Sequence, residues 1–269
     1  MAEPTDQGEH GFQPVRGADA LERVRSFILA QGWAGLQLGG HLERNSQQGT
    51  SPESMLWWVR GPAGEARAVA LLHGETLGLL VPLADARAEA RRMLDRCQSK
   101  LTRIHVLEGQ METSNLDQFE CHRTVLAVAP QARRRSFGLP LTRPATHRDA
   151  DQVHLIYSEV GWMREASAAV WRERLGRERC WVAELEGQLV AAARWTVAFG
   201  AWVEVGGVAT RSQFRRRGAA AAVTWAATSA ALAEGRQVAL RFRDPELAAL
   251  YFPLGFEPVA LEQSFQRIV

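Results

Sequence analysis

Three arginines, a glycine and four alanines follow one another in the stretch RSQFRRRGAAAA, residues 211–222. At the start of a helix the first backbone N–H groups lack partners, and the helix dipole adds partial positive charge. Phosphate binds at such a place without a particular side chain. The pattern therefore predicts a phosphate cradle in which Gly218, Ala219 and Ala220 leave room for a pyrophosphate and the arginines supply countercharge. Ala221 and Ala222 let the helix pack closely.

Such a cradle must lie between a strand and a helix, and the flanking sequence predicts both. Residues 201–210 read as a strand, and the Ala-rich residues 218–234 read as a helix that stops at Gly235. The other elements expected in this half are an extended stretch at 139–142, a helix from Asp149, a hairpin of 180–185 and 188–198 around Glu186-Gly187, a strand at 237–243, a short helix capped by Asp244-Pro245 and a strand from Phe256.

The N-terminal half repeats this order more faintly. The elements expected there are helices at 21–31, 84–97 and 110–119 and strands at 55–60, 66–73, 77–81, 102–107 and 122–128. The segment APQARRRSFGLP, residues 129–140, has prolines near both ends and no apolar period, so it is the linker candidate. These features predict two α/β domains, 1–137 and 138–269.

Composition excludes several classes of protein. The chain has 269 residues, 46% of them hydrophobic, and a net charge of only +2, so any strongly positive site is local. Residues 133–135 form a basic run without interleaved aromatics, which favours a solvated linker over a nucleic-acid site. No apolar run approaches the ~18 residues of a membrane span. The histidines lack metal-ligand spacing, so no metal is expected. Cys97, Cys121 and Cys180 lie far apart, which predicts reduced thiols and a cytoplasmic protein.

At residues 215–220 the sequence resembles the GCN5-related N-acetyltransferase (GNAT) superfamily. Arg215-Arg-Arg-Gly-Ala-Ala220 is similar to its acetyl-CoA signature, Arg/Gln-x-x-Gly-x-Gly/Ala, and follows a strand that ends in GGVAT at residues 206–210. LYFPLGF at residues 250–256 resembles a second family motif, Leu-Tyr-x-x-x-Gly-Phe. Both motifs occur in the family order, and the resemblance covers residues 138–269.

The resemblance implies a mixed, mainly antiparallel sheet flanked by helices, with a V-shaped cleft that holds acetyl-CoA as co-substrate. The pyrophosphate would lie on the amides of residues 216–221, and the pantetheine arm would pair with the preceding strand, which a bulge at Gly206 and Gly207 would splay from its neighbour. The cofactor-binding residues so expected are Val208, Ala209, Thr210, Arg215, Arg216, Arg217, Gly218, Ala219, Ala220 and Ala221.

Two side chains are the expected catalytic residues. Tyr251 matches the family tyrosine that protonates the leaving thiolate, and a phenol with a reference pKa of about 10 is protonated at neutral pH. Its alternative role is to pack its ring under the terminal strand. Glu204 shares one face of its strand with Trp202 and Gly206, and the family implies a base on this strand. A solvated or salt-bridged role for Glu204 is an equal alternative.

The sequence also departs from the family pattern. Asp244 stands near a place where many members have an asparagine that contacts pantetheine. In the N-terminal half the corresponding loop, VPLADA at residues 81–86, has no glycine, no preceding arginine, and an acid, Asp85, where a pyrophosphate would lie. That half is therefore expected to be a degenerate GNAT-like domain without cofactor, which shapes the acceptor site or a homodimer.

The function so predicted is N-acetyltransfer from acetyl-CoA to a primary amine by direct attack in a ternary complex. A noncatalytic acyl-CoA-binding or regulatory module is the alternative, with Tyr251 and Glu204 serving structure. The acceptor pocket would include residues 159–169, whose sequence does not identify the amine. Small amines, amino acids, antibiotics, peptides and protein lysines remain open.

Overall fold

The computed structural model describes residues 11–47, 56–111, 116–133, 140–161 and 166–268. The chain forms two compact units. The first contains residues 1–125 together with 260–269, and the second contains residues 126–259. None of the helices in the described ranges is long and apolar enough to cross a membrane.

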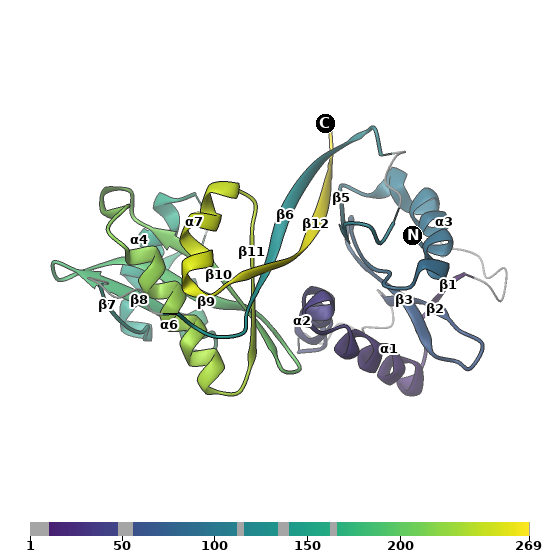
Figure 1. Ribbon diagram of the computed structural model, residues 1–269, viewed down its shortest axis with the longest axis horizontal. Coiled ribbons are helices and arrows are strands. Elements are labelled where there is room, and N and C mark those ends of the chain that lie inside the picture. The colour runs from purple at the N-terminus through teal and green to yellow at the C-terminus, as the bar shows by residue number, and fades with distance from the viewer. Residues whose placement is uncertain (1–10, 48–55, 112–115, 134–139, 162–165, 269) are drawn as a thin grey trace. The chain divides into compact units, whose positions relative to one another are not determined.

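The first unit has a sheet with the order β1-β2-β3-β4-β5-β12. Its elements are β1 (Phe12–Pro14), α1 (Ala18–Ala30), α2 (Leu36–Gln47), β2 (Leu56–Arg60), β3 (Ala66–His73), β4 (Thr76–Leu80), α3 (Arg87–Cys97), β5 (Arg103–Leu107) and part of β12 (Glu257–Arg267). Neighbouring strands pair antiparallel except β4 and β5, which are parallel. Ala68 and Ala70 of β3 pack in one buried cluster with Ala90 and Leu94 of α3. Since side chains alternate between the faces of a strand, α3 covers one face of this sheet (Figure 1).

The second unit has the strand order β6-β11-β10-β9-β8-β7. Its elements are the end of β6 (Phe119–Ala129), β7 (Leu141–Pro144), α4 (Ala150–Glu159), α5 (Ala168–Leu175), β8 (Cys180–Leu185), β9 (Gln188–Phe199), β10 (Trp202–Thr210), α6 (Ala219–Ala233), β11 (Gln237–Phe242), α7 (Ala248–Tyr251) and the start of β12. Only β10 and β11 are a parallel pair among the registers from β7 to β11. The sheet is thus mixed and mainly antiparallel, as predicted.

Helices cover both faces of the second sheet (Figure 1). Trp195 of β9 donates from Nε1 to the carbonyl of Ala227 in α6 at 3.1 Å, which places α6 on one face. On the other face, α4 and α5 share a buried cluster with β8 and β9 that includes Tyr157 and Trp171. Ala219, Ala221, Ala222, Ala227 and Ala231 of α6 are buried, so this face of the helix packs closely on the strands.

Most of the predicted elements are present within a few residues of the expected bounds. The hairpin turns at Glu186 and Gly187, both with positive φ (53° and 74°), as a tight two-residue turn requires. The helix expected at 110–119 is wrong for its described residues: 110, 111 and 116–118 are not helical and Phe119 starts β6, while 112–115 lie outside the described residues. Helix α2 and strand β1 were not anticipated.

The compact units differ from the expected domains, 1–137 and 138–269. Residues 134–139, where the boundary was placed, lie outside the described residues. Strand β6 begins in the first unit and ends in the second. Strand β12 begins in the second unit and ends in the first, because residues 262–266 pair antiparallel with β5.

Candidate active site

Strands β10 and β11 pair over only part of their length. Their parallel register runs from Trp202 opposite Gln237 to Glu204 opposite Ala239. Strand β10 continues to Thr210 and β11 to Phe242, and no further pair joins these two fully described strands. The pairing of the two strands therefore stops beyond Glu204, at the place where the family resemblance implies a V-shaped cleft.

The separation coincides with irregular pairing on the other side of β10. The register between β10 and β9 shifts between Glu204 and Val205 and again between Gly206 and Ala209. Gly207 has a φ of +57°, which a residue with a side chain adopts only with strain. The bulge expected at Gly206 and Gly207 is thus present, and it bends β10 where β11 leaves it.

Helix α6 begins directly beyond the end of β10. Gly218 is its N-cap, with φ 81° in the left-handed region, and no side chain caps the helix. The amide of Ala222 donates to the carbonyl of Gly218 at 2.9 Å, so the amides of the three residues before it precede the first intrahelical bond. Arg216 also has a positive φ of 64°. The loop therefore presents backbone amides at an uncapped helix N-terminus, which suits an anion.

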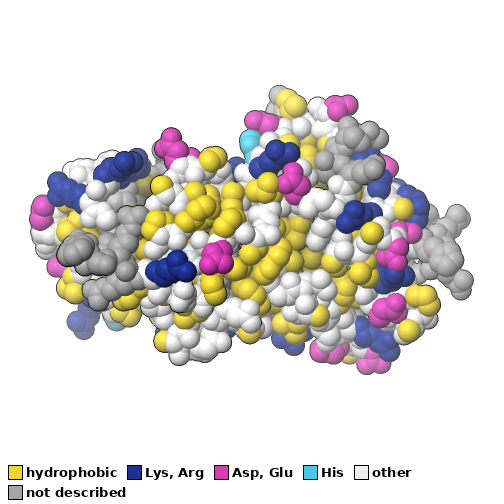
Figure 2. Space-filling view, in the orientation of Figure 1, with side chains coloured by type: hydrophobic (Ala, Val, Ile, Leu, Met, Phe, Trp, Pro, Cys, Tyr) yellow, Lys and Arg dark blue, Asp and Glu magenta, His cyan; other side chains and the backbone are white. Residues whose placement is uncertain are grey.

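The three arginines before this helix are exposed. Arg217 pairs with Glu186 of the β8–β9 turn at 3.0 Å, and its guanidinium lies over the ring of Phe214. Arg215 and Arg216 extend the positive charge of the loop. On the face shown in Figure 2 the described Lys and Arg side chains are scattered among acidic ones.

Tyr251 ends α7 as a buried side chain, 5% exposed. Its ring contacts Phe242 at the end of β11, with centroids 5.3 Å apart, and Phe256 at 6.2 Å. Burial raises the pKa of the Tyr251 phenol to about 12. The hydroxyl therefore stays protonated at every physiological pH, as a hydrogen-bond donor requires.

Glu204 lies at the point where β10 and β11 separate. Its Oε2 is 2.9 Å from Nε of Arg241 on β11, and its Oε1 accepts a hydrogen bond from Thr196 of β9 at 2.7 Å. Its side chain is only 9% exposed. The carboxylate thus joins three strands, and this ion pair favours the salt-bridged alternative.

Asp244 has a structural task. Its carboxylate accepts from the amide of Glu246 at 2.9 Å and caps the turn that leads into α7, with Pro245 as the first residue of that turn. Aspartate and asparagine cap a helix equally well, so this cap does not by itself explain the departure from the family asparagine.

The corresponding place in the first unit differs in charge and in shape. Asp85 lies in the turn before α3 and pairs with Arg67 of β3, and Glu89 adds a second acid in the first turn of α3. Strands β4 and β5 also pair only from Thr76 to Gly78, yet Oε1 of Gln110 accepts from the amide of Val81 just beyond β4 at 2.8 Å. Met111, Leu116 and Phe119 pack into the same buried cluster as Val81. A side chain of the unit itself thus bonds the backbone where a cofactor strand would pair.

Sequence reasoning did not find Tyr157, Thr196 or Arg241. Tyr157 donates to the carbonyl of Gly207 at 2.7 Å, and Arg241 and Thr196 hold Glu204. Tyr157 lies on the buried face of a helix, and Arg241 at a polar position of an alternating strand. Both patterns are ordinary for core and surface residues, so only the fold shows what they contact.

A parallel strand pair that stops pairing at Glu204 and the uncapped start of α6 at Gly218 thus occur together in the second unit. Residues 145–256 match the model of the "Acetyltransferase (GNAT) family". These residues are a GNAT acetyltransferase domain, and the protein is an acyltransferase.

Solved structures show the same fold over most of the chain. An acetyltransferase of the GNAT family from Colwellia psychrerythraea has a TM-score of 0.65 at 11% identity, covering 96% of this chain and 99% of its own. A tandem GNAT protein of the clavulanic acid biosynthesis pathway has a TM-score of 0.57 at 15% identity, covering 95% and 97%. A GCN5-related N-acetyltransferase from Kribbella flavida has a TM-score of 0.56 at 20% identity, covering 76% and 87%. No curated protein matches the sequence. The tandem GNAT fold is therefore shown.

Proposed function

We propose that this protein transfers an acetyl group from acetyl-CoA to a primary amine, with both substrates bound together in the second unit. The observation that carries the proposal is the opening between β10 and β11 beyond Glu204, which leads to the uncapped start of α6 at Gly218. An extended arm can pair along the free part of β10, and a pyrophosphate can accept from the amides of the loop.

The residues proposed to hold acetyl-CoA follow from this geometry. Val208, Ala209 and Thr210 belong to the end of β10 that does not pair with β11, and they would bond the pantetheine amides. The amides of residues 216–221 would bind the pyrophosphate, and Arg215 to Arg217 would add countercharge. The cofactor supplies an activated acetyl thioester, and the chain supplies position and proton control.

Proton control is assigned to Tyr251. Because burial raises the pKa of its phenol to about 12, the hydroxyl keeps its proton and can donate to the sulfur as CoA leaves. The acceptor amine must lose a proton, for which Glu204 was the candidate base. Since Arg241 and Thr196 engage its two oxygens, we assign that proton to solvent and give Glu204 a structural role.

The first unit is proposed to bind no acetyl-CoA. Asp85 and Glu89 place negative charge at the start of α3, and the Gln110 side chain bonds the backbone amide of Val81 just beyond β4. We propose that this unit shapes the acceptor site or a homodimer. Part of the acceptor region, residues 162–165, lies outside the described residues.

The experiment that tests the function is acetyl-CoA-dependent release of free CoA thiol with a panel of amines, amino acids, peptides and aminoglycoside antibiotics. Cys121 is exposed and adds an enzyme thiol to the background, so the protein alone is the blank. Thiol release that needs one amine class, with an acetylated product of the expected mass, supports the proposal. Cofactor binding without release for any amine favours the noncatalytic alternative.

A further inference from the structure

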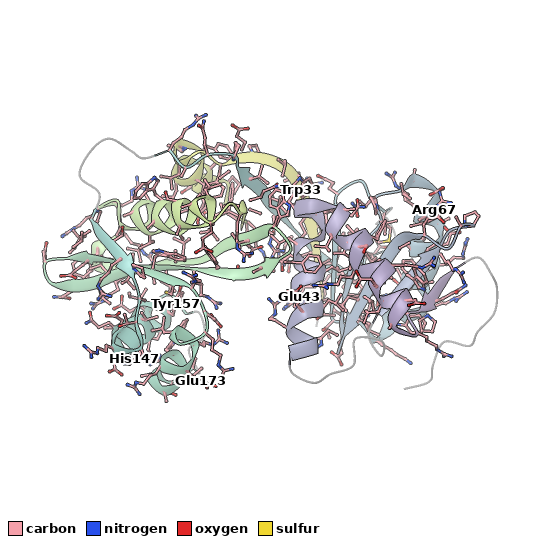
Figure 3. The ribbon with its side chains drawn as sticks, turned by 90° about the horizontal axis from the view of Figure 1, so that it is seen from below. Trp33, Glu43, Arg67, His147, Tyr157 and Glu173 are labelled. Carbon is pink, nitrogen blue, oxygen red and sulfur yellow. The ribbon has the colours of Figure 1, made fainter. Side chains whose placement is uncertain are left out.

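A tyrosine of α4 contacts the backbone of the bulge in β10. Oη of Tyr157 donates to the carbonyl oxygen of Gly207 at 2.7 Å. The side chain is 1% exposed, and its ring stacks on Trp171 of α5 with centroids 4.5 Å apart and planes 5° apart. Figure 3 shows Tyr157 between the layer of α4 and α5 and the sheet. Packing therefore holds the hydroxyl at one point of the bulge.

The backbone at this point favours a glycine. A Cβ added to Gly207 would lie 3.0 Å from Nε of Arg194 and 3.3 Å from Oη of Tyr157, and the φ of +57° is itself unfavourable for other residues. A buried tyrosine hydroxyl requires a hydrogen-bond partner. Because α4 approaches β10 closely at Gly207, the carbonyl of Gly207 is the partner of the Tyr157 hydroxyl.

The hydrogen bond also sets the direction of an amide. The carbonyl of Gly207 and the N–H of Val208 belong to one peptide group, and the described residues contain no cis peptide bond. In a trans peptide the two groups point in opposite directions. Because the carbonyl points to Tyr157, the N–H of Val208 points away from α4. Val208 lies on the part of β10 that β11 does not cover.

We propose that Tyr157 is a positioning residue for the acyl-CoA arm. It fixes the Gly207–Val208 peptide so that β10 presents this amide, in one orientation, to a strand-like ligand. Tyr157 acts through the backbone and does not contact the acetyl group. The proposal rests on the proposed function, since it assigns the pantetheine arm to this part of β10.

The test is Tyr157→Phe, which keeps the stacked ring and removes the hydroxyl. Titration calorimetry of the full chain with acetyl-CoA should show a Kd about three- to tenfold weaker, as expected for loss of one hydrogen bond. Adenosine 3′,5′-bisphosphate, which carries no pantetheine, should bind with a Kd changed by less than about twofold. A general structural defect would weaken the binding of both ligands. It would not weaken the binding of acetyl-CoA alone.

Two further variants control the result. Thr228→Val removes another buried hydroxyl, on α6, which has no hydrogen-bond partner among the described residues, and it should change neither Kd. Gly207→Ala disturbs the same peptide from the strand side and should reproduce the selective loss, which keeps the test open if Tyr157→Phe folds poorly. Equal acetyl-CoA affinity in Tyr157→Phe and wild type, or equal weakening of both ligands, would overturn the inference. A wild-type chain that binds neither ligand would instead contradict the proposed function.

Discussion

At the scale of single residues, the site separates groups that act on substrate from groups that hold the strands. Tyr251 belongs to the first kind in our account: a buried phenol with a pKa of about 12, next to the end of β11. Glu204 belongs to the second, because it pairs with Arg241 and accepts from Thr196. The role given to Tyr251 predicts a lower kcat when this residue is changed, whereas the role given to Glu204 predicts a lower stability.

Tyr251→Phe should lower kcat by roughly 100-fold or more, because the leaving sulfur loses its donor. The Kd for acetyl-CoA should stay within about twofold of wild type, since the ring still packs on Phe242. Because its pKa is raised from 10.0 to about 12, Tyr251 should not cause a fall in rate near pH 10. Steady-state kinetics from neutral pH to pH 10 measure kcat and its pH dependence, and titration calorimetry measures the Kd. A variant with wild-type kcat would leave Tyr251 only its packing role.

Glu204→Gln should act mainly on stability. Removing the negative charge leaves the guanidinium of Arg241, whose side chain is 24% exposed, without its ion pair, and the free energy of unfolding should fall by roughly 1–3 kcal/mol. Chemical denaturation gives this value, and kcat should fall less than about tenfold. The double variant Glu204→Gln/Arg241→Gln should recover part of the loss. A kcat lower by roughly 100-fold with unchanged stability would instead identify Glu204 as the base.

At the scale of elements, the start of α4 shows how the second unit is held. Thr146 caps the turn before the helix, and the Asp149 carboxylate accepts from the amide of Thr146 at 2.7 Å and from Arg143 at 2.8 and 2.7 Å. The hydrogen bonds from Arg143 hold the pKa of Asp149 at about 2. This cap orients α4, the helix that carries Tyr157.

Asp149→Asn should therefore lower the free energy of unfolding by roughly 2 kcal/mol near pH 7. Since the folded pKa lies below the ordinary value of 3.8, the stabilisation is present above pH 3.8 and is lost as pH falls toward about 2. The difference in the free energy of unfolding between wild type and variant, measured by urea denaturation, should become smaller over that pH range. A gap that is constant with pH would show that the charge of Asp149 does not matter.

The sequence predicted those elements whose signals are local. The Ala-rich α6 with Gly218 before it and the Glu186-Gly187 turn are such signals. The helix expected at 110–119 is wrong for its described residues, and Met111 and Phe119 instead fill the core of the first unit. The Tyr157–Gly207 bond joins residues 50 apart in the chain, so no local pattern could predict it.

At the scale of the whole molecule, the chain is divided differently from a simple tandem of two segments. Strand β6 supplies residues 126–129 to the second unit, and the last ten residues return to the first. Within the second unit the amide of Arg133 donates to the carbonyl of Leu254 at 2.9 Å. A cut at residue 137 would remove these residues from the unit that contains the proposed site.

A fragment of residues 138–269 should therefore melt below a fragment of residues 126–259. The 138–269 fragment lacks the buried Leu126, Ala127 and Ala129. Its C-terminal end also carries Phe265 without β5, the strand with which this end pairs. Circular dichroism melts of the two fragments at equal concentration make the comparison. Equal or higher stability of the 138–269 fragment would support the domain boundary expected from the sequence.

The central claim is that the start of α6 binds the pyrophosphate of acetyl-CoA, and thermal melting of the full chain with increasing acetyl-CoA tests it most directly. A ligand that binds only the folded state raises Tm with its concentration. Gly218→Trp should abolish the shift. The matched control is Gly235→Trp, because Gly235 follows the other end of α6 with φ +72° and nothing within 4 Å of an added Cβ. We predict a rising Tm for wild type and Gly235→Trp but a constant Tm for Gly218→Trp. Equal shifts in all three, or no shift in wild type at millimolar acetyl-CoA, would contradict the account.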